Sequence, residues 1–344
     1  MKNKIIEYFK FNKNLRPLII AEISANHCGK KSIFLNSIRS AAKNGADLVK
    51  IQTYEPNDIT LNISHKINGW DKKKIWNLYF KAQTPYKWHE AAFKLAKKLK
   101  IELFSTPFSE KAVDYLIKFK VKLFKLSSFE INDFKLIHKI AKTKKPIIIS
   151  TGMSSLKEIK ECVKIINKFH NKIMILHCVS GYPTQEKEAN LNRILSLKKY
   201  FRNINIGLSD HTNDILTSIA SIPLGTKVIE KHFILSNKLN SYDKKFSITP
   251  PQLKDLSNLS KKIFSTLGDG NFKIQVSEKN SIKFRRSIFA IKDIEKGEKF
   301  TKENINTFRP TVGLSSKNYF KILGKRAKKK ILCDNPIYSN HIEI

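Results

Sequence analysis

Residues 204–233, INIGLSDHTNDILTSIASIPLGTKVIEKHF, contain a complete strand–helix–strand pattern. The β-branched run INIGLSDH is followed by the helical pattern DILTSIASIPLG and then by a second apolar run, TKVIEKHF. Both runs carry a histidine at or near their end, His211 and His232. A helix between two such runs predicts adjacent parallel strands whose carboxyl ends lie at one edge of a sheet.

The same alternation extends back to residue 17, with helical patterns between the runs. The earlier apolar runs are PLIIAEIS (17–24), ADLVKIQ (46–52), IELFSTP (101–107), LFKLSS (123–128), KPIIIST (145–151) and KIMILHCVS (172–180). Eight runs with mostly helical connections predict an α/β fold, a (β/α)8 TIM barrel over residues 1–268. An open doubly wound sheet is the weaker alternative, because no GxGxxG loop follows the first run.

The character of the chain changes after residue 268. We predict a polar linker over residues 269–282 and a small β-rich domain over residues 283–344, where short strand-like runs alternate with turns. The insertion at residues 52–85 is too long for a simple connection, so we expect a loop that covers the barrel mouth.

Composition is that of a globular protein, with 41% hydrophobic residues. The net charge of +36 comes mostly from Lys spread along the chain, whereas a nucleic-acid binder concentrates Arg and Lys on one face. Because Lys, Ile and Asn are enriched together, we interpret the charge as compositional drift and expect no nucleic-acid partner. No signal peptide or membrane-length apolar run is evident, which predicts a cytoplasmic protein without a membrane partner. The four cysteines form no CxxC pair, which argues against a zinc ribbon or a disulfide framework.

Polar side chains gather where the apolar runs end. In a barrel these ends converge on one face, where barrel enzymes carry their active sites. The residues are Glu22, Lys50, Gln52, Thr106, Lys125, Ser128, Ser150, Ser180, Tyr182, Ser209, His211, Glu230 and His232.

Two interpretations of the histidines follow from the residues alone. His211 and His232 are either ordinary core or cap histidines, or two ligands of one divalent metal whose other positions belong to water or substrate. Lys50 and Lys125 likewise suit either a Schiff base or a cradle for an anion. The neighbouring hydroxyl groups favour the anion cradle.

Eight motifs carry a family resemblance in order and spacing: IIAEISANHCG, VKIQTY, FSTPF, FKLSSFE, IISTGM, LHCVSGYPT, GLSDHT and IEKHF. They resemble the sialic acid synthase family, whose members condense phosphoenolpyruvate with an N-acetylated sugar to give a nonulosonic acid. The C-terminal part resembles the antifreeze-protein-like (SAF) domain of that family. Within the family, SANH, QTYEPNDIT, AQTPYKWHEAAF and YDKKFSITP are similar to the pseudaminic acid synthase branch.

The resemblance implies a carbon–carbon bond-forming transferase that acts on phosphoenolpyruvate and 2,4-diacetamido-2,4,6-trideoxy-L-altrose. It implies Mn²⁺ or Mg²⁺ on His211 and His232, with Glu22 or Glu130 as the base that activates water. The residues implied to bind phosphoenolpyruvate are Lys50, Thr106, Lys125, Ser128, Ser150, Ser180 and Ser209, and those implied to contact the sugar are Glu22, Gln52, Tyr182, Asp243, Phe246 and Arg309. Arg309 would come from the partner subunit of a domain-swapped homodimer.

Other functions stay open at this point. The same chemistry on the neuraminate or legionaminate precursor is one alternative, because two of three departures from the usual family pattern, NSYDKK and Thr311, concern sugar recognition; the third is Cys28. A Lys-rich protein that binds RNA or another acidic polymer would show salt-sensitive binding without dependence on His211. A catalytically inactive scaffold is disfavoured by the intact histidine pair.

Overall fold

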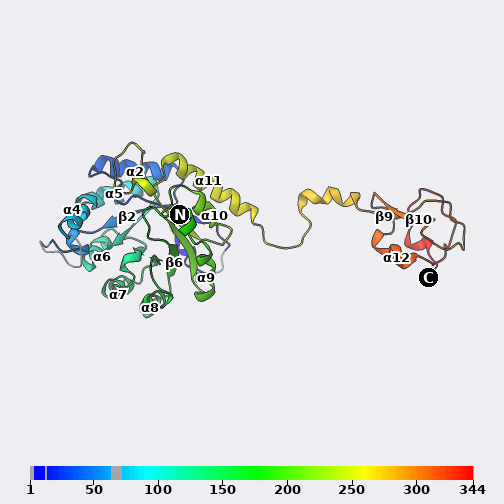
Figure 1. The fold of residues 1–344 in the computed structure, drawn as a ribbon, viewed down its shortest axis with the longest axis horizontal. Coiled ribbons are helices and arrows are strands. Elements are labelled where there is room, and N and C mark those ends of the chain that lie inside the picture. The colour runs from blue at the N-terminus through cyan, green and yellow to red at the C-terminus, as the bar shows by residue number, and fades with distance from the viewer. Residues whose placement is uncertain (1–3, 12–13, 63–71, 344) are drawn as a thin grey trace. The chain divides into compact units, whose positions relative to one another are not determined.

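The computed structural model describes residues 4–11, 14–62 and 72–343. Parallel strands close into an eight-stranded barrel in sequence order, and β8 pairs with β1, with Glu22 opposite His232 (Figure 1). The strands are β1 (Leu18–Glu22), β2 (Leu48–Thr53), β3 (Glu102–Pro107), β4 (Phe124–Leu126), β5 (Ile147–Ser150), β6 (Ile173–Cys178), β7 (Asn205–Asp210) and β8 (Val228–His232). The predicted (β/α)8 barrel is confirmed.

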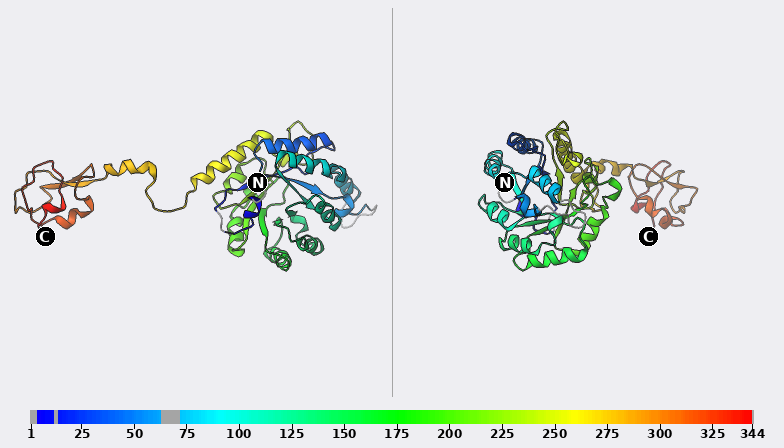
Figure 2. Two further views of the ribbon diagram at one scale, coloured as in Figure 1. Left: turned by 180° about the vertical axis from the view of Figure 1, so that it is seen from behind. Right: turned by 60° about the vertical axis from the view of Figure 1, so that its left-hand side comes forward.

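Helices surround the barrel, as Figure 2 shows from two further sides. They are α2 (Lys31–Lys43), α5 (Tyr86–Leu99), α6 (Glu110–Ile117), α7 (Phe134–Lys142), α8 (Leu156–Asn167), α9 (Asn192–Tyr200), α10 (Leu216–Ala220) and α11 (Pro250–Thr266). Local sequence fixes several starts: α8 begins after a capping box in which Ser155 and Glu158 satisfy each other's backbone amides, and α11 begins with proline. Among the residues that the structure describes, no helix is long and apolar enough to span a membrane.

Alternation along the strands creates two apolar layers. One set of side chains points outward and packs against the helices, and the other fills the barrel interior. The amino end of the barrel is closed by the first segment of the chain, α1 (Lys4–Glu7) and the residues after it. Tyr8 is buried there, and Asn205 Nδ2 donates to its carbonyl oxygen at 2.8 Å. Access to the interior is therefore from the carboxyl ends of the strands.

The insertion at residues 52–85 contains two helices, α3 (Pro56–Ile59) and α4 (Lys72–Ala82), where we expected a loop. The Tyr79 ring of α4 packs edge-on against Tyr54, with centroids 6.1 Å apart. His27 Nε2 contacts the Ala82 carbonyl oxygen at 3.2 Å. These contacts tie α4 to loops at the barrel mouth, while residues 63–71 of the insertion lie outside the described residues.

The chain divides into two compact units, residues 1–268 and 269–344. The second unit contains the antiparallel strands β9 (Ser287–Ala290) and β10 (Ile305–Phe308) around a small core that includes Ile288, Phe300 and Ile305. The short helix α12 (Tyr319–Ile322) and several 3-10 turns complete this unit. A 3-10 helix at Val276–Phe284 occupies part of the segment expected to be an irregular linker.

Candidate active site

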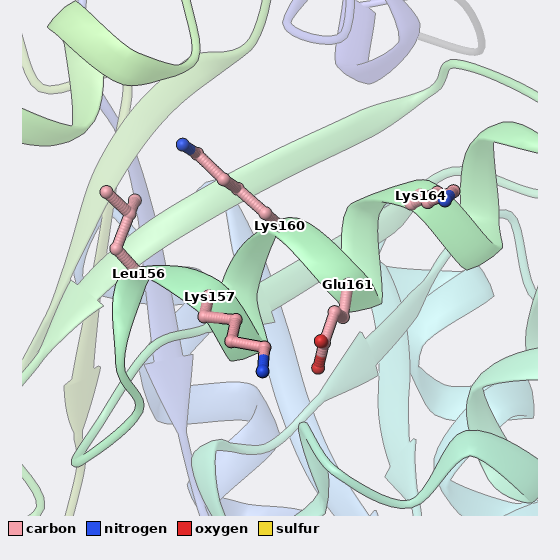
Figure 3. A pocket seen from close by; sticks show the side chains of 5 residues that line it. All are labelled: Leu156, Lys157, Lys160, Glu161 and Lys164. Carbon is pink, nitrogen blue, oxygen red and sulfur yellow. The ribbon is translucent and has the colours of Figure 1, made fainter.

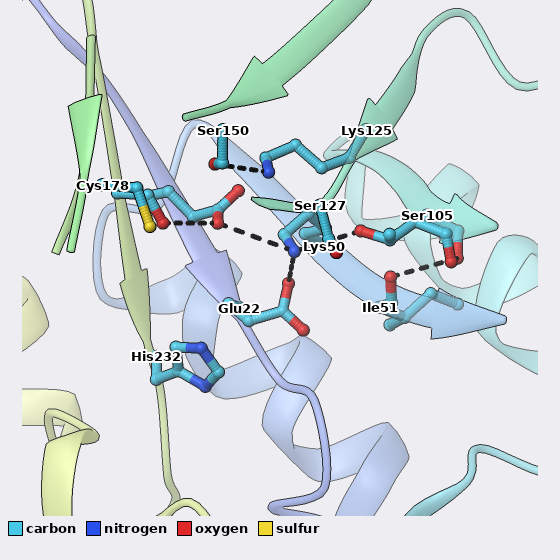
Figure 4. Close-up of polar contacts among 12 residues, drawn as sticks. Glu22, Lys50, Ile51, Ser105, Lys125, Ser127, Ser150, Cys178 and His232 are labelled. Atoms are coloured by element: carbon cyan, nitrogen blue, oxygen red, sulfur yellow. Dashed lines mark hydrogen bonds and ion pairs between the residues drawn. The ribbon is translucent and has the colours of Figure 1, made fainter. Parts of the chain in front are cut away.

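The polar pocket forms because the inward-facing row of each strand changes character toward its carboxyl end. Lower in the barrel this row is apolar, with Ile20, Leu48, Phe104, Leu123, Ile148, Leu176 and Val228. Two residues further along the same strands, the inward-facing residues are Glu22, Lys50, Thr106, Lys125, Ser150, Cys178 and Glu230. Figure 4 labels five of them: Glu22, Lys50, Lys125, Ser150 and Cys178. All of them are buried, so the strands deliver a set of charges and hydroxyls to one enclosed place.

The two histidines lie side by side at the rim of this pocket. The ring centroids of His211 and His232 are 5.3 Å apart, and both side chains are buried. His211 Nδ1 lies 2.9 Å from the Val179 carbonyl oxygen, which makes this nitrogen the donor. Nε2 of His211 therefore keeps its lone pair. The structure thus brings together the pair that the sequence singled out.

His232 is oriented by an acid from the loop after β8. Its Nδ1 lies 3.4 Å from Asp243 Oδ2, an ion-pair distance rather than a hydrogen bond. Asp243 also accepts from the Ala25 amide at 3.2 Å. Burial would raise the pKa of Asp243, but His232, Ser24 and the Ala25 amide outweigh it and lower the pKa. Asp243 is therefore a carboxylate that faces His232 Nδ1, and its negative charge favours a proton on Nδ1 and a lone pair on Nε2.

Lys50 is a buried cation between two buried acids. Its Nζ lies 2.5 Å from Glu22 Oε2 and 3.6 Å from Glu230 Oε1, and it donates to Thr106 Oγ1 at 3.2 Å. Burial disfavours the ammonium, but the two acids outweigh burial and raise the pKa of Lys50. Glu230 in turn accepts from Ser209 Oγ at 3.0 Å. Lys50 is therefore held charged in the floor of the pocket.

Lys125 and a group of hydroxyls form the second cationic part of the pocket. Lys125 Nζ donates to Ser150 Oγ at 2.6 Å, and burial lowers its pKa even though Glu230 opposes the shift. Ser128 Oγ and Ser180 Oγ are 2.8 Å apart. Lys125 is thus paired with Ser150, and Ser128 with Ser180, in two hydroxyl-containing contacts.

Gly152 lies against Ser128 and Ser180, and it was not among the residues predicted from the sequence. Its φ is +49°, and a Cβ built there would lie 2.4 Å from Ser128 Cβ and 2.7 Å from Ser180 Oγ. Only glycine therefore lets this backbone lie against the two serines. The available signal was its position directly after a strand, within IISTGM.

Glu130 and Glu22, the two candidate bases, differ in environment. Glu130 is half-buried in the 3-10 turn after β4 and accepts a hydrogen bond from Ser127 Oγ. Burial raises the pKa of Glu130 to about 7, although the nearby Lys125 opposes the shift. Glu22 is fully buried and paired with Lys50. Glu130 therefore fits proton transfer near neutral pH better than Glu22 does.

An aromatic wall lines the rim beside the histidines. Tyr182 lies 4.4 Å from His211 between ring centroids, and the buried Phe246 lies 4.8 Å from His232. Tyr182 and Phe246 also contact each other, at 5.2 Å. Phe129, which we did not predict, extends this wall. The residue is 56% exposed, and its ring is stacked with that of Tyr182 at a distance of 6.4 Å between centroids.

The remaining predicted residues are less closely tied to the pocket. Gln52 lies near the end of β2 and is half-buried. Arg309 belongs to the second unit, follows β10 and is exposed. Cys178, which was not among the predicted site residues, has its Sγ among the pocket residues, 3.9 Å from His211 Nδ1. Cys178 could have been found from the sequence, because it lies two residues after Leu176 in the same strand and therefore faces the same side of the sheet.

Elsewhere on the barrel unit, a surface groove of about 390 Å³ runs along α8 (Figure 3). Every lining residue comes from this one helix: Leu156, Lys157, Lys160, Glu161 and Lys164. It contains none of the strand-end residues. Its lysines are part of the positive charge that is scattered over the surface, and exposed charges of this kind contribute little to specific binding.

The histidine pair suits a divalent cation by its donor chemistry. Each ring directs Nδ1 toward an acceptor and presents Nε2 as a free lone pair. Among the described residues, no group of three or more His, Cys, Asp or Glu side chains is placed to hold a metal ion. Two imidazoles therefore fit a cation completed by water and substrate oxygens, and do not fit a closed structural zinc site.

Comparison with known proteins identifies the family of the chain. The NeuB family model matches residues 37–272, and the SAF domain model matches residues 285–343. The chain belongs to the NeuB family. It is 42% identical to pseudaminic acid synthase of Campylobacter jejuni, over 93% of this chain and 95% of the relative. It is 40% identical to pseudaminic acid synthase of Helicobacter pylori, over 95% and 98%.

Solved structures show the same architecture. The chain is similar to an N-acetylneuraminic acid synthetase from Leptospira borgpetersenii crystallised with citrate, with a TM-score of 0.72 and 30% identity over 79% of this chain and 92% of that one. The family resemblance predicted from the motifs is confirmed, and so is the C-terminal SAF domain. The protein is therefore an enzyme of the phosphoenolpyruvate-dependent class that forms carbon–carbon bonds.

Proposed function

We propose that this protein is a pseudaminic acid synthase. It condenses phosphoenolpyruvate, 2,4-diacetamido-2,4,6-trideoxy-L-altrose and water to pseudaminic acid and phosphate. The observation that carries the proposal is the histidine pair, 5.3 Å apart between ring centroids, at the rim of a pocket floored by Lys50 and Lys125. The similarity to two pseudaminic acid synthases supports the choice of sugar.

Phosphoenolpyruvate is the anion that the lower pocket would take. Lys50, kept charged by two acids, and Lys125, hydrogen-bonded to Ser150, supply cations for its carboxylate and phosphate. The hydroxyls that complete this binding are those of Thr106, Ser128, Ser150, Ser180 and Ser209. In this arrangement C3 of the enol phosphate would face the histidine pair, where the sugar aldehyde binds.

A Mn²⁺ or Mg²⁺ ion held by Nε2 of His211 and His232 would polarise the aldehyde oxygen of the open-chain sugar and stabilise the alkoxide that develops there. The chain's own part is orientation: Asp243 and the Val179 carbonyl keep the free imidazole nitrogens facing the pocket. The new bond joins C3 of the enol phosphate to C1 of the sugar.

Water must then add to C2 of the former enol before phosphate leaves. We assign the removal of its proton to Glu130, because a carboxyl whose pKa is raised to about 7 by burial accepts and returns protons near neutral pH. Glu22 would contact the sugar and keep Lys50 in place. Loss of phosphate from the tetrahedral carbon gives the keto acid.

Sugar recognition would fall to the rim. Tyr182 and Phe246 offer an aromatic surface to the 6-deoxy carbon, and Gln52 and Asp243 offer hydrogen-bonding groups. Arg309 would reach an acetamido group from the partner subunit of a domain-swapped homodimer. The proposal further assigns residues 269–282 as the linker that allows the swap, and the cytoplasm as the location of the enzyme.

The test is a panel of three sugars: the diacetamido-trideoxy-altrose, the legionaminate precursor and N-acetylmannosamine. Phosphate release from phosphoenolpyruvate is followed for each, with metal-stripped enzyme and His211→Ala as controls. We expect preferred turnover of the altrose sugar, lost in both controls. Preferred turnover of another sugar would instead support a legionaminate or neuraminate synthase, which the 38% identity to a Campylobacter jejuni N,N'-diacetyllegionaminic acid synthase makes the second candidate.

A further inference from the structure

The strands that carry the two histidines hold a second charge pair, which the proposed mechanism does not use. Asp210 and Lys231 are opposite each other in the register of β7 and β8. Lys231 Nζ lies 3.1 Å from Asp210 Oδ2, and the side chains are 0% and 1% exposed. Since side chains alternate along a strand, this pair points away from the barrel interior while the histidine that follows each member points inward.

The pair holds the backbone that follows His211. Lys231 Nζ donates to the Thr212 carbonyl oxygen at 2.5 Å, and Asp210 Oδ1 accepts from the Thr212 amide at 2.9 Å and from its hydroxyl at 2.7 Å. Asp210 Oδ2 also accepts from Ser218 Oγ of α10 at 2.5 Å. The residues on both sides of His211 are thereby fastened to β8, immediately next to His232.

The surroundings of Asp210 exclude a ligand-binding role. A cavity of about 10 Å³ behind His211 is lined by His177, Asp210 and Thr212, among others. A space of that size holds at most one water molecule. The two charges thus lie on the outward-facing side of β7 and β8, and the proposed mechanism gives neither of them a contact with substrate.

We propose that Asp210 and Lys231 are positioning residues that set the separation of His211 and His232, and so the affinity of the pair for a divalent cation. This inference rests on the proposed function, in which the histidines bind Mn²⁺ or Mg²⁺. The physical reason is that a buried ion pair adds little stability over well-packed apolar residues but has a strict geometry. Metal ligands must lie within about 0.2 Å of their ideal distances, so a small shift of β7 against β8 weakens binding.

The test measures Mn²⁺ binding directly, by electron paramagnetic resonance of the free ion in titrations of the full chain. Asp210→Asn removes one charge, and the double variant Asp210→Asn/Lys231→Met leaves no unpaired buried charge if the single variant folds poorly. Asp47→Asn is the matched control: Asp47 also pairs with a cation, Arg16, at 2.9 Å and accepts from the Ile19 amide at 2.9 Å, but at the opposite end of the barrel.

We expect Asp210→Asn and the double variant to weaken Mn²⁺ binding about 10- to 100-fold, as loss of a group that orients metal ligands does. Asp47→Asn should leave the affinity for Mn²⁺ unchanged, even if it lowers the melting temperature as much as the Asp210 variants do. Raising Mn²⁺ should restore turnover in the Asp210 variants, with the KM for phosphoenolpyruvate unaltered. If the folded double variant binds Mn²⁺ with wild-type affinity, the positioning role is overturned, but the proposed metal site is not. If the wild-type enzyme binds no Mn²⁺, or if the His211→Ala variant binds Mn²⁺ as tightly as the wild type, the proposed metal site is overturned as well.

Discussion

Gly152→Ala tests whether the serine cluster is the site of the anion. In the structure Gly152 has φ +49°, and an alanine Cβ would lie 2.4 Å from Ser128 Cβ. The left-handed conformation of an L-residue costs about 1 to 2 kcal/mol. Forcing a methyl group into a packed site adds about 1 to 3 kcal/mol. We therefore expect the variant to lose about 2 to 5 kcal/mol of unfolding free energy.

Gly29→Ala separates the two contributions. Gly29 has φ +68° in the same unit, but a Cβ added there meets nothing within 4 Å, so only the conformational cost of about 1 to 2 kcal/mol remains. Both variants are unfolded in urea and followed by circular dichroism. Equal losses for the two would show that Gly152 is not confined by the serines.

The same variant reports on phosphoenolpyruvate. A methyl group that displaces the hydroxyls of Ser128 and Ser180 weakens a hydrogen bond to a charged ligand, worth about 1.5 to 3 kcal/mol, which corresponds to a rise in KM of about 10- to 150-fold. Initial rates of phosphate release at saturating sugar give this KM. A folded Gly152→Ala enzyme with the wild-type KM for phosphoenolpyruvate would refute the assignment of the cradle.

Three further outcomes are expected. Burial raises the pKa of Glu130 to about 7, so the kcat of the wild-type enzyme should rise as pH increases through about 7. Glu130→Gln should lose this pH dependence and about 100-fold in kcat. The pH–rate profiles of the two enzymes test this expectation. Lys50→Met leaves the buried Glu22 without its ion-pair partner and should cost about 3 to 5 kcal/mol in urea unfolding, whereas a smaller loss would mean that Glu22 takes up a proton. Phe129→Ala removes an exposed ring beside the proposed sugar site and should raise the KM for the sugar about 5-fold, in keeping with a stacking contact of about 1 kcal/mol, while an unchanged sugar KM would place the sugar elsewhere.

The strand-end residues could be predicted because the signal is local. A charged or hydroxyl residue such as Lys50 or Ser150 directly after an apolar run has few explanations in a buried strand, and the barrel topology brings all such ends to one face. His211 and His232 followed from the same logic, since only one helical connection separates their strands.

The residues that sequence reasoning missed depend on contacts between distant segments. Gly152 matters because Ser128 and Ser180 approach it from two other loops, and no local pattern reveals that approach. The role of Phe129 depends on where Tyr182 lies. The bounds of α3 and α4 were missed for a different reason: short helices in an insertion carry too little periodic signal to be distinguished from a loop.

The environment of Lys125 has a thermodynamic consequence for ligand capture. Burial lowers the pKa of this lysine, and an enol phosphate placed against it would raise that pKa again, because a nearby anion stabilises the ammonium. At a pH above the lowered pKa of Lys125, this lysine must then take up a proton from solvent when the complex forms. At such a pH, calorimetric enthalpies of phosphoenolpyruvate association should accordingly differ between PIPES and Tris, whose ionisation heats are unequal, and Lys125→Met should remove the part of the difference that comes from this lysine.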